Sequence, residues 1–475
     1  MKPKKILHLF FSRPRWGVTL FLLSLVLVAT SCDDDDDNPT PTETQNIVQV
    51  AQGSSNLTTL VSALTKYPDL VSTLSGNGDF TVFAPTNAAF TDLLAAVGQT
   101  SIDDIPEDVL KNILQYHVIT TDDLNANELT AGSLETANTE DIAVTTTGGV
   151  KLNGTANVTT ADVEATNGVV HIVDAVLVPP SVIPIVGTIV APAYFNKDFT
   201  TLIAAVKAAD PSILTTLLGN GPSGNGLTLF APTNAAFTAA GITSLPDQTT
   251  LNAVLTYHVI DGEVMASDLP EGSASIPTLN GNIYLSNNGS SGVFINGTTE
   301  VIATDISASN GVVHVIDRTL MPPSQTIAEI AVDLSTSSNP EFTQLVAALS
   351  RTSGTATDLL AAVSNADVNL TVFAPTDAAF EQLYTALGVT SVDEIPLATL
   401  TAVLQHHVIG DRVLSTDLVD GTAETLNGDV TINAGDGTIT DESGNAANLS
   451  ENAALLNVLA TNGVIHTIDR VLLPQ

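Results

Sequence analysis

The sequence contains a single cysteine, Cys32, and few basic residues. Its 475 residues include 14 Lys and Arg against 51 Asp and Glu, which gives a formal net charge of −37. One cysteine forms no intrachain disulfide, and once Cys32 is modified no thiolate remains for a metal site or for nucleophilic catalysis. Without a basic stripe to displace counterions from phosphates, nucleic acid is excluded as a partner. The acidic excess favours solubility in a salty medium.

The sequence also lacks the short motifs of common catalytic sites. It has no GxSxG elbow, phosphate-binding loop or HExxH helix. Glycine clusters such as residues 219–221 lie where a helix gives way to a strand and are typical of turns. A pair of glycosidase carboxylates stays open, because nothing distinguishes two of the 51 acidic residues. We therefore predict a protein that is not an enzyme and has no cofactor or bound metal.

The first 31 residues are typical of an export signal. A basic start precedes an apolar run over residues 18–29, which is far shorter than the roughly 20 residues that span a bilayer. Small residues then lead into Cys32, as in bacterial lipoprotein signals, so we expect Cys32 to be acylated, for example with palmitate, and to become the mature N-terminus. The alternative is simple secretion, since Ala29 stands where many such signals carry leucine.

A spacer is predicted over residues 32–45. Five aspartates follow Cys32 directly, and a Pro- and Thr-rich stretch comes next, so the segment has little to bury. An acidic run after an acylated cysteine resembles the surface-export signals of Bacteroidetes lipoproteins. We therefore expect a lipid-anchored protein of the outer membrane that is exposed at the cell surface, with the periplasmic face of a membrane as the alternative.

Two phrases occur three times each in the chain. The first, Phe-Ala-Pro-Thr-Asn/Asp-Ala-Ala-Phe, covers residues 83–90, 230–237 and 373–380. The second, Asn-Gly-Val-Val/Ile-His, covers residues 167–171, 310–314 and 462–466. Copies lie about 150 residues apart, which is the size of a domain and not of a solenoid repeat. We predict three modules, over residues 46–180, 186–323 and 325–474.

Hydrophobic periodicity predicts helices first and strands later in each module. Leu57, Leu60 and Leu64 recur at helical spacing, so we expect an amphipathic helix to open the first module. The Phe-Ala-Pro phrase is typical of a short buried strand closed by a turn, with the following threonine capping a helix. Apolar residues at 109, 110, 113 and 114 place His117 on the buried face of a later helix. Alternating strands follow, which predicts an α+β fold with a β-sandwich or half-barrel core.

The paired phrases, with Tyr116-His117 between them, resemble the two signature stretches and the central Tyr-His of the fasciclin domain family. The resemblance covers nearly all of the chain after about residue 47. It implies three tandem modules, each a twisted β-sandwich packed against short helices. It also implies a role in cell adhesion or matrix contact, as in periostin, and no general catalytic activity.

The resemblance also implies candidate contact residues. The Tyr-His pair becomes His406-His407 in the third module, and the Asp-Ile type of motif becomes Asn457-Val458 there. The candidates carried over are Tyr116, His117, Asp162, Tyr257, His258, Asp305 and His407. From the residues alone, the histidines are also explained as core residues with satisfied ring nitrogens, and two histidines per module that meet in space would be the alternative of a metal site.

These inferences combine into one functional hypothesis and two alternatives. We expect a surface-anchored, non-catalytic lipoprotein that presents three modules to an extracellular protein or polysaccharide ligand. The first alternative is a polysaccharide-binding accessory protein or hydrolase at the cell surface. The second is a structural spacer of the envelope.

Overall fold

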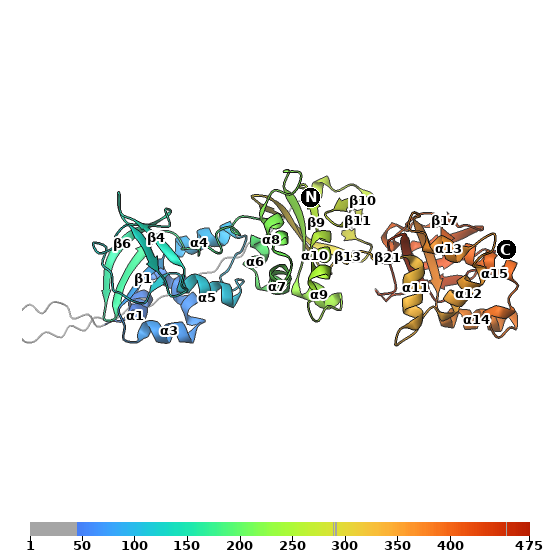
Figure 1. Ribbon diagram of the computed structural model, residues 1–475, viewed down its shortest axis with the longest axis horizontal. Coiled ribbons are helices and arrows are strands. Elements are labelled where there is room, and N and C mark those ends of the chain that lie inside the picture. The colour runs from blue at the N-terminus through green and yellow to red at the C-terminus, as the bar shows by residue number, and fades with distance from the viewer. Residues whose placement is uncertain (1–44, 288, 290–291, 453) are drawn as a thin grey trace, which may run out of the picture. The chain divides into compact units, whose positions relative to one another are not determined.

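A computed structural model describes residues 45–475 apart from 288, 290, 291 and 453 (Figure 1). The predicted export signal, the acylation site Cys32 and the spacer up to residue 44 lie outside the described residues. None of the helices in the described part is long and apolar enough to cross a bilayer.

All three modules place helices before and between strands. Module one contains α1 (Ile47–Gly53), α2 (Thr58–Thr65), α3 (Pro68–Ser75), α4 (Asn87–Ala96), α5 (Glu107–Gln115), β1 (Phe80–Pro85), β2 (Val118–Ile119), β3 (Gly132–Glu135), β4 (Asp141–Thr145), β5 (Lys151–Leu152), β6 (Ala156–Ala165) and β7 (Gly168–Val173). Module two contains α6 (Ala191–Tyr194), α7 (Thr200–Ala208), α8 (Pro211–Leu218), α9 (Asn234–Ala239), α10 (Gln248–Tyr257), β8 (Leu227–Pro232), β9 (Val259–Asp261), β10 (Gly272–Thr278), β11 (Gly281–Asn287), β12 (Val293–Ile295), β13 (Thr299–Ala308) and β14 (Gly311–Ile316). Module three contains α11 (Ile327–Thr336), α12 (Thr343–Thr352), α13 (Leu359–Ser364), α14 (Asp377–Leu387), α15 (Leu397–Gln405), β15 (Leu370–Pro375), β16 (Val408–Ile409), β17 (Gly421–Glu424), β18 (Asp429–Asn433), β19 (Thr438–Thr440), β20 (Ala446–Asn448), β21 (Val458–Ala460) and β22 (Gly463–Ile468).

The first repeated phrase builds the predicted strand, turn and helix. β1 ends at Pro85, and α4 begins two residues later because the Thr86 hydroxyl accepts a hydrogen bond from the Ala89 amide. Thr233 and Thr376 cap their helices in the same way. The prediction that the helix around Leu57 opens module one is wrong by one helix, since α1 precedes it, and α6 and α11 likewise come first in their modules. α1 and α6 are short, and a weak periodicity of this length carries little sequence signal.

The sheet of each module is organised around one parallel strand pair. β1 pairs in parallel with β7, and the equivalent pairs are β8 with β14 and β15 with β22. In modules one and two these pairs belong to seven-stranded sheets, of order β2-β1-β7-β6-β5-β4-β3 in module one. In module three the strand equivalent to β6 is interrupted between β20 and β21, which leaves two four-stranded sheets.

The central strands are buried on both faces. Val82 and Ala84 of β1 pack against the helical side, where α1 and α3 lie (Figure 1), whereas Phe83 packs into a second cluster with β4 and β5. A layer of short helices therefore covers one side of the sheet, and the curled outer strands cover the other. This arrangement confirms the predicted α+β class, and it places β7 in the interior of its sheet, between β1 and β6.

Candidate functional site

An asparagine amide begins the second repeated phrase and joins three segments of its module. The Asn167 carbonyl oxygen accepts from the Ile47 amide at the start of α1, and its Nδ2 donates to the carbonyls of Leu74 and Gly76 at the end of α3. Asn310 and Asn462 make the equivalent three bonds. All three asparagines are buried, so each amide satisfies backbone groups that would otherwise be stranded without water.

His117, which follows helix α5, is buried and hydrogen-bonded through both ring nitrogens. His117 Nδ1 lies 2.7 Å from the Ile113 carbonyl, to which it donates, and Nε2 accepts from the Leu177 amide at 2.8 Å. This ring therefore ties the end of α5 to the segment after β7. His258 and His407 make the same pair of bonds. Burial lowers the pKa of each of these rings to about 4, so they are neutral at physiological pH.

The histidine of the second phrase holds a bulge in the neighbouring strand. His171 Nε2 donates to the Leu124 carbonyl, and Nδ1 accepts from the amide of Asp162. Asp162 has a left-handed backbone, φ 56°, where the register of β6 against β7 shifts. Its carboxylate accepts from the Ala126 amide at 2.6 Å. Asp305 with His314, and Asn457 with His466, repeat this arrangement.

The tyrosine of the Tyr-His pair lies inside the β layer. Tyr116 is fully buried, its hydroxyl donates to the Asp141 carbonyl at 2.7 Å, and it accepts from Asn153 Nδ2. Tyr257 is bonded equivalently, and its pKa is raised to about 12, mainly by burial. In the third module His406 takes this place. Its Nδ1 is bonded to the Asn427 carbonyl, and its Nε2 is buried without a hydrogen-bond partner in the described part of the chain.

The structure places the predicted contact residues in two environments. Five of them are buried, with at most 2% of each residue exposed: Tyr116, His117, Tyr257, His258 and His407. Asp162 and Asp305 are at the surface of the bulge, and 43% of the Asp162 side chain is exposed. Ligand contact through any of these residues stays a prediction. Within the described ranges no three His, Cys, Asp or Glu side chains gather as a metal site would require.

A comparison with protein-family models matches the fasciclin domain at residues 55–179, 197–322 and 340–474. The chain belongs to the fasciclin domain family. Each matched segment contains both repeated phrases, one Tyr-His or His-His pair and one left-handed Asp or Asn bonded to the histidine of the second phrase, so the fasciclin framework is built three times. The matched segments fall within the three predicted modules, whose outer limits stay predictions.

Relatives of this fasciclin protein come from animals and bacteria. The chain is 29% identical over 439 residues to pig transforming growth factor-beta-induced protein ig-h3, which covers 90% of this chain and 58% of the relative. It is 42% identical over 135 residues to protein sll1483 of Synechocystis, which covers 28% of this chain and 73% of that protein. The chain thus spans little more than half the length of ig-h3. A solved FAS1 domain pair from the insect cell adhesion molecule fasciclin I aligns with 58% of the chain at 20% identity, with a TM-score of 0.28.

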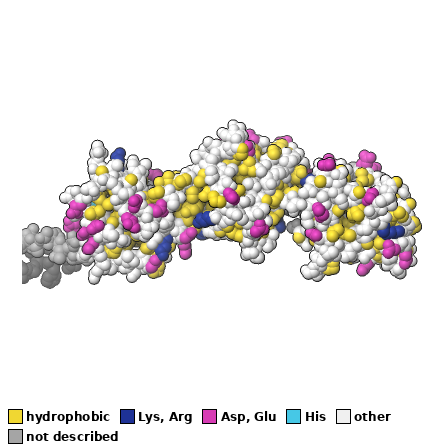
Figure 2. Space-filling view, in the orientation of Figure 1, with side chains coloured by type: hydrophobic (Ala, Val, Ile, Leu, Met, Phe, Trp, Pro, Cys, Tyr) yellow, Lys and Arg dark blue, Asp and Glu magenta, His cyan; other side chains and the backbone are white. Residues whose placement is uncertain are grey.

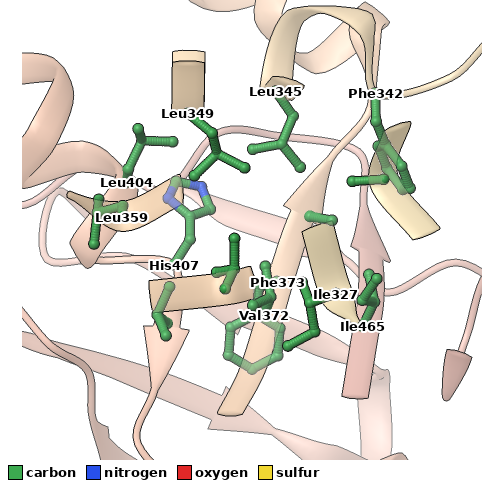
Figure 3. A pocket seen from close by; sticks show the side chains of 14 residues that line it. Ile327, Phe342, Leu345, Leu349, Leu359, Val372, Phe373, Leu404, His407 and Ile465 are labelled. Carbon is green, nitrogen blue, oxygen red and sulfur yellow. The ribbon is translucent and has the colours of Figure 1, made fainter. Parts of the chain in front are cut away.

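An apolar cavity lies beside the buried histidine of each fasciclin module. Figure 3 shows the His407 ring among leucines of the helices, above Val372 and Phe373 of β15. The cavity holds about 20 Å³ in module three, with counterparts of about 20 Å³ beside His117 and about 10 Å³ beside His258. Room for about one water molecule makes these cavities gaps in side-chain packing and not ligand pockets.

The signature asparagines are the functional residues of the framework that sequence reasoning missed. The Asn-Gly dipeptide of their phrase predicts a tight turn, and residues 166 and 167 do connect β6 and β7 in this way. What the turn does not reveal is the contact with α1 and α3, which lie about 90 to 120 residues away in sequence. The available signal was the repetition of asparagine itself, since a turn alone would also accept aspartate or glycine.

Proposed function

We propose that this fasciclin protein is a surface-anchored, non-catalytic adhesion lipoprotein whose three domains contact an extracellular protein or polysaccharide. One observation carries the proposal: the polar side chains of both repeated phrases and of the Tyr-His pair form hydrogen bonds within their own modules. Groups committed in this way are unsuited to act as nucleophiles or general bases, which need an accessible reacting partner. The function then belongs to the outer surfaces, and repetition multiplies those surfaces.

The surface offers an acidic face to any partner. Figure 2 shows Asp and Glu side chains scattered over the visible face with few Lys or Arg among them. Such a surface disfavours anionic partners and supports an uncharged or cationic ligand. Among the contact residues carried over from the family, Asp162 and Asp305 are the ones that reach solvent, so we propose them before the buried tyrosines and histidines.

Membrane attachment in this proposal depends on Cys32. We expect two or more acyl chains on Cys32 to hold the chain stably on the outer membrane, because each buried methylene adds about 0.8 kcal/mol. A Cys32→Ser variant should therefore move from the membrane fraction to the soluble fraction and lose metabolic labelling with radioactive palmitate. Cells that carry the variant should attach to immobilised matrix polymers no better than cells from which the gene is deleted.

The control for this experiment is a substitution in the same segment that leaves the cysteine intact, such as Thr30→Ser. Protease treatment of intact cells then separates the surface from the periplasmic face, because only surface modules are digested. Cys32→Ser protein that remains as firmly in the membrane fraction as the wild type would contradict the anchor. Turnover of a matrix polymer by purified protein would contradict the non-catalytic role.

A further inference from the structure

The hairpin of β10 and β11 in module two presents a polar outer face with one aromatic ring. The register pairs Ser275 with Tyr284 and Ser273 with Ser286, so these side chains share a face. The alternate residues Ile283 and Leu285 are fully buried on the opposite face. The Tyr284 side chain therefore projects away from the core of its own module.

This aromatic ring is specific to module two. The β4 and β18 positions equivalent to Tyr284, which face Ser133 and Thr422 across the strands, are Ala143 and Thr431. The outer faces of those hairpins also carry opposed carboxylates, Glu135 with Asp141 and Glu424 with Asp429. In module two the corresponding pair is Pro277 with Asn282, which is uncharged. The outer face of this hairpin in module two therefore carries an aromatic ring and lacks the opposed carboxylates of the other two modules.

The ring lines a cleft of about 340 Å³. Besides the hairpin, the cleft is lined by residues that flank β15 and β16 of module three, among them Asn369, Asp411 and Arg412. The Arg412 guanidinium lies 4.4 Å from the centroid of the Tyr284 ring and donates to the Asn369 side chain and to the Thr461 carbonyl. A volume of this order is at the lower end of the range for small-molecule sites.

Several polar groups of the cleft have no hydrogen-bond partner among the residues that the structure describes. Arg412 Nε is buried without a hydrogen-bond acceptor, and Arg412 forms no ion pair with a carboxylate of the described chain. The hydroxyls of Ser273 and Ser275 and the amide of Asn282 are exposed and make no side-chain hydrogen bond in the described structure. A buried donor without an acceptor costs free energy, so a ligand that supplies one is favoured at this place.

We propose that this cleft binds a neutral glycan, with a sugar ring packed near Tyr284 and its hydroxyl groups bonded to the surrounding side chains. Sugar hydroxyls both donate and accept, and the cleft offers matching groups: Arg412 Nε–H as a donor, the Asp411 carboxylate as an acceptor, and serine hydroxyls and the Asn282 amide as both. Asp411 and Asp417 both line the cleft and would repel the carboxylate of a uronic acid. The inference rests on the proposed adhesive function and names the ligand class for one of its surfaces.

Calorimetric titration of the purified full chain tests this assignment with defined probes: cellohexaose and laminarihexaose as neutral glycans, and hexagalacturonate as the charged one. We expect a neutral hexasaccharide to bind, and Tyr284→Ala to weaken that binding by about tenfold or more through loss of the ring contact. Tyr284→Phe, which keeps the ring, should bind within about threefold of the wild type. Thr431→Ala, the matched position in module three, should bind as the wild type does.

A second variant separates a loss of glycan binding from a loss of folding. The Asn282 side chain makes no hydrogen bond within the described structure, although the backbone carbonyl of Asn282 accepts from Tyr257, so Asn282→Ala should weaken glycan binding without changing the melting temperature. Failure of both neutral probes to bind, preference for hexagalacturonate, or unchanged binding by Tyr284→Ala would each overturn the proposal. Cells with Tyr284→Ala that still attach to matrix polymers would leave the adhesive function standing while removing this site from it.

Discussion

Replacing Gly168 with alanine is expected to destabilise module one by roughly 4 kcal/mol, among the largest effects of a single substitution. Gly168 begins β7 opposite Phe80, with φ +144°, and an added Cβ would lie 2.0 Å from the Phe80 carbonyl oxygen. Neither backbone can retreat, because β1 is held by β2 on its other side. Hydrogen exchange of the full chain, resolved by mass spectrometry, should show the β1 and β7 amides losing protection.

Gly132 supplies a matched control for this substitution. It has a similar φ of +155° but no atom within 4 Å of an added Cβ. Gly132→Ala therefore introduces the backbone strain alone, which costs about 1 to 2 kcal/mol. Equal protection of β1 and β7 in the two variants would show that the close approach of the two strands does not limit the stability of module one.

Acid is expected to unfold module three before the other two modules. Burial lowers the pKa of both His407 and His466 in module three to about 4. In the other two modules burial lowers the pKa of His117 and His258 to about 4, and it also lowers the pKa of His171. A protonated ring would direct a second N–H at a backbone amide that already donates to it. The unfolded chain has no such conflict and binds a proton below pH 6.5, the ordinary histidine pKa.

Whether acid stabilises or destabilises module three depends on which state, folded or unfolded, binds more protons. Because these folded-state pKa values are depressed, the stabilisation is fully present above pH 6.5 and is lost as the pH falls from 6.5 to about 4. Each such histidine costs about 1.4 kcal/mol of folding stability per pH unit in this window, so module three, which has two histidines with a pKa of about 4, should lose stability most steeply. Pulse proteolysis in urea at pH 7.5, 6.5 and 5.5 identifies the module that opens first. A flat stability of module three over this range would contradict the assignment of neutral, doubly bonded histidines.

Local elements could be predicted from the sequence, whereas hydrogen bonds between residues far apart in the chain could not. Residues 83–90 contain their own strand, proline stop and threonine cap, so β1 and α4 follow from neighbours in sequence. The apolar face of α5 likewise predicted the burial of His117. By contrast, the partner of His117 Nε2 is the Leu177 amide, 60 residues later, and no local pattern specifies that bond.

The same limit applies to the candidate surfaces. Alternating sequence predicts strands in this part of each module, but only the folded hairpin shows that Tyr284 faces outward and that Ala143 and Thr431 occupy the equivalent positions. The left-handed bulge at Asp162 was also absent from the sequence interpretation, because aspartate adopts this backbone only where the register of β6 and His171 enforces it. The register between strands that are far apart in the sequence therefore decides which side chains are exposed at the surface.

The central claim is that three non-catalytic modules bind a ligand together. The rate at which the protein dissociates from an immobilised ligand tests this most directly. Biolayer interferometry can compare the three-module chain with chains truncated to two modules and to one on immobilised matrix polymers. If the modules bind together on one tether, the three-module chain should dissociate more than about tenfold more slowly than a single module, because later contacts form at high effective concentration. Equal dissociation rates, or a loss strictly proportional to the number of modules removed, would contradict a multivalent adhesive function.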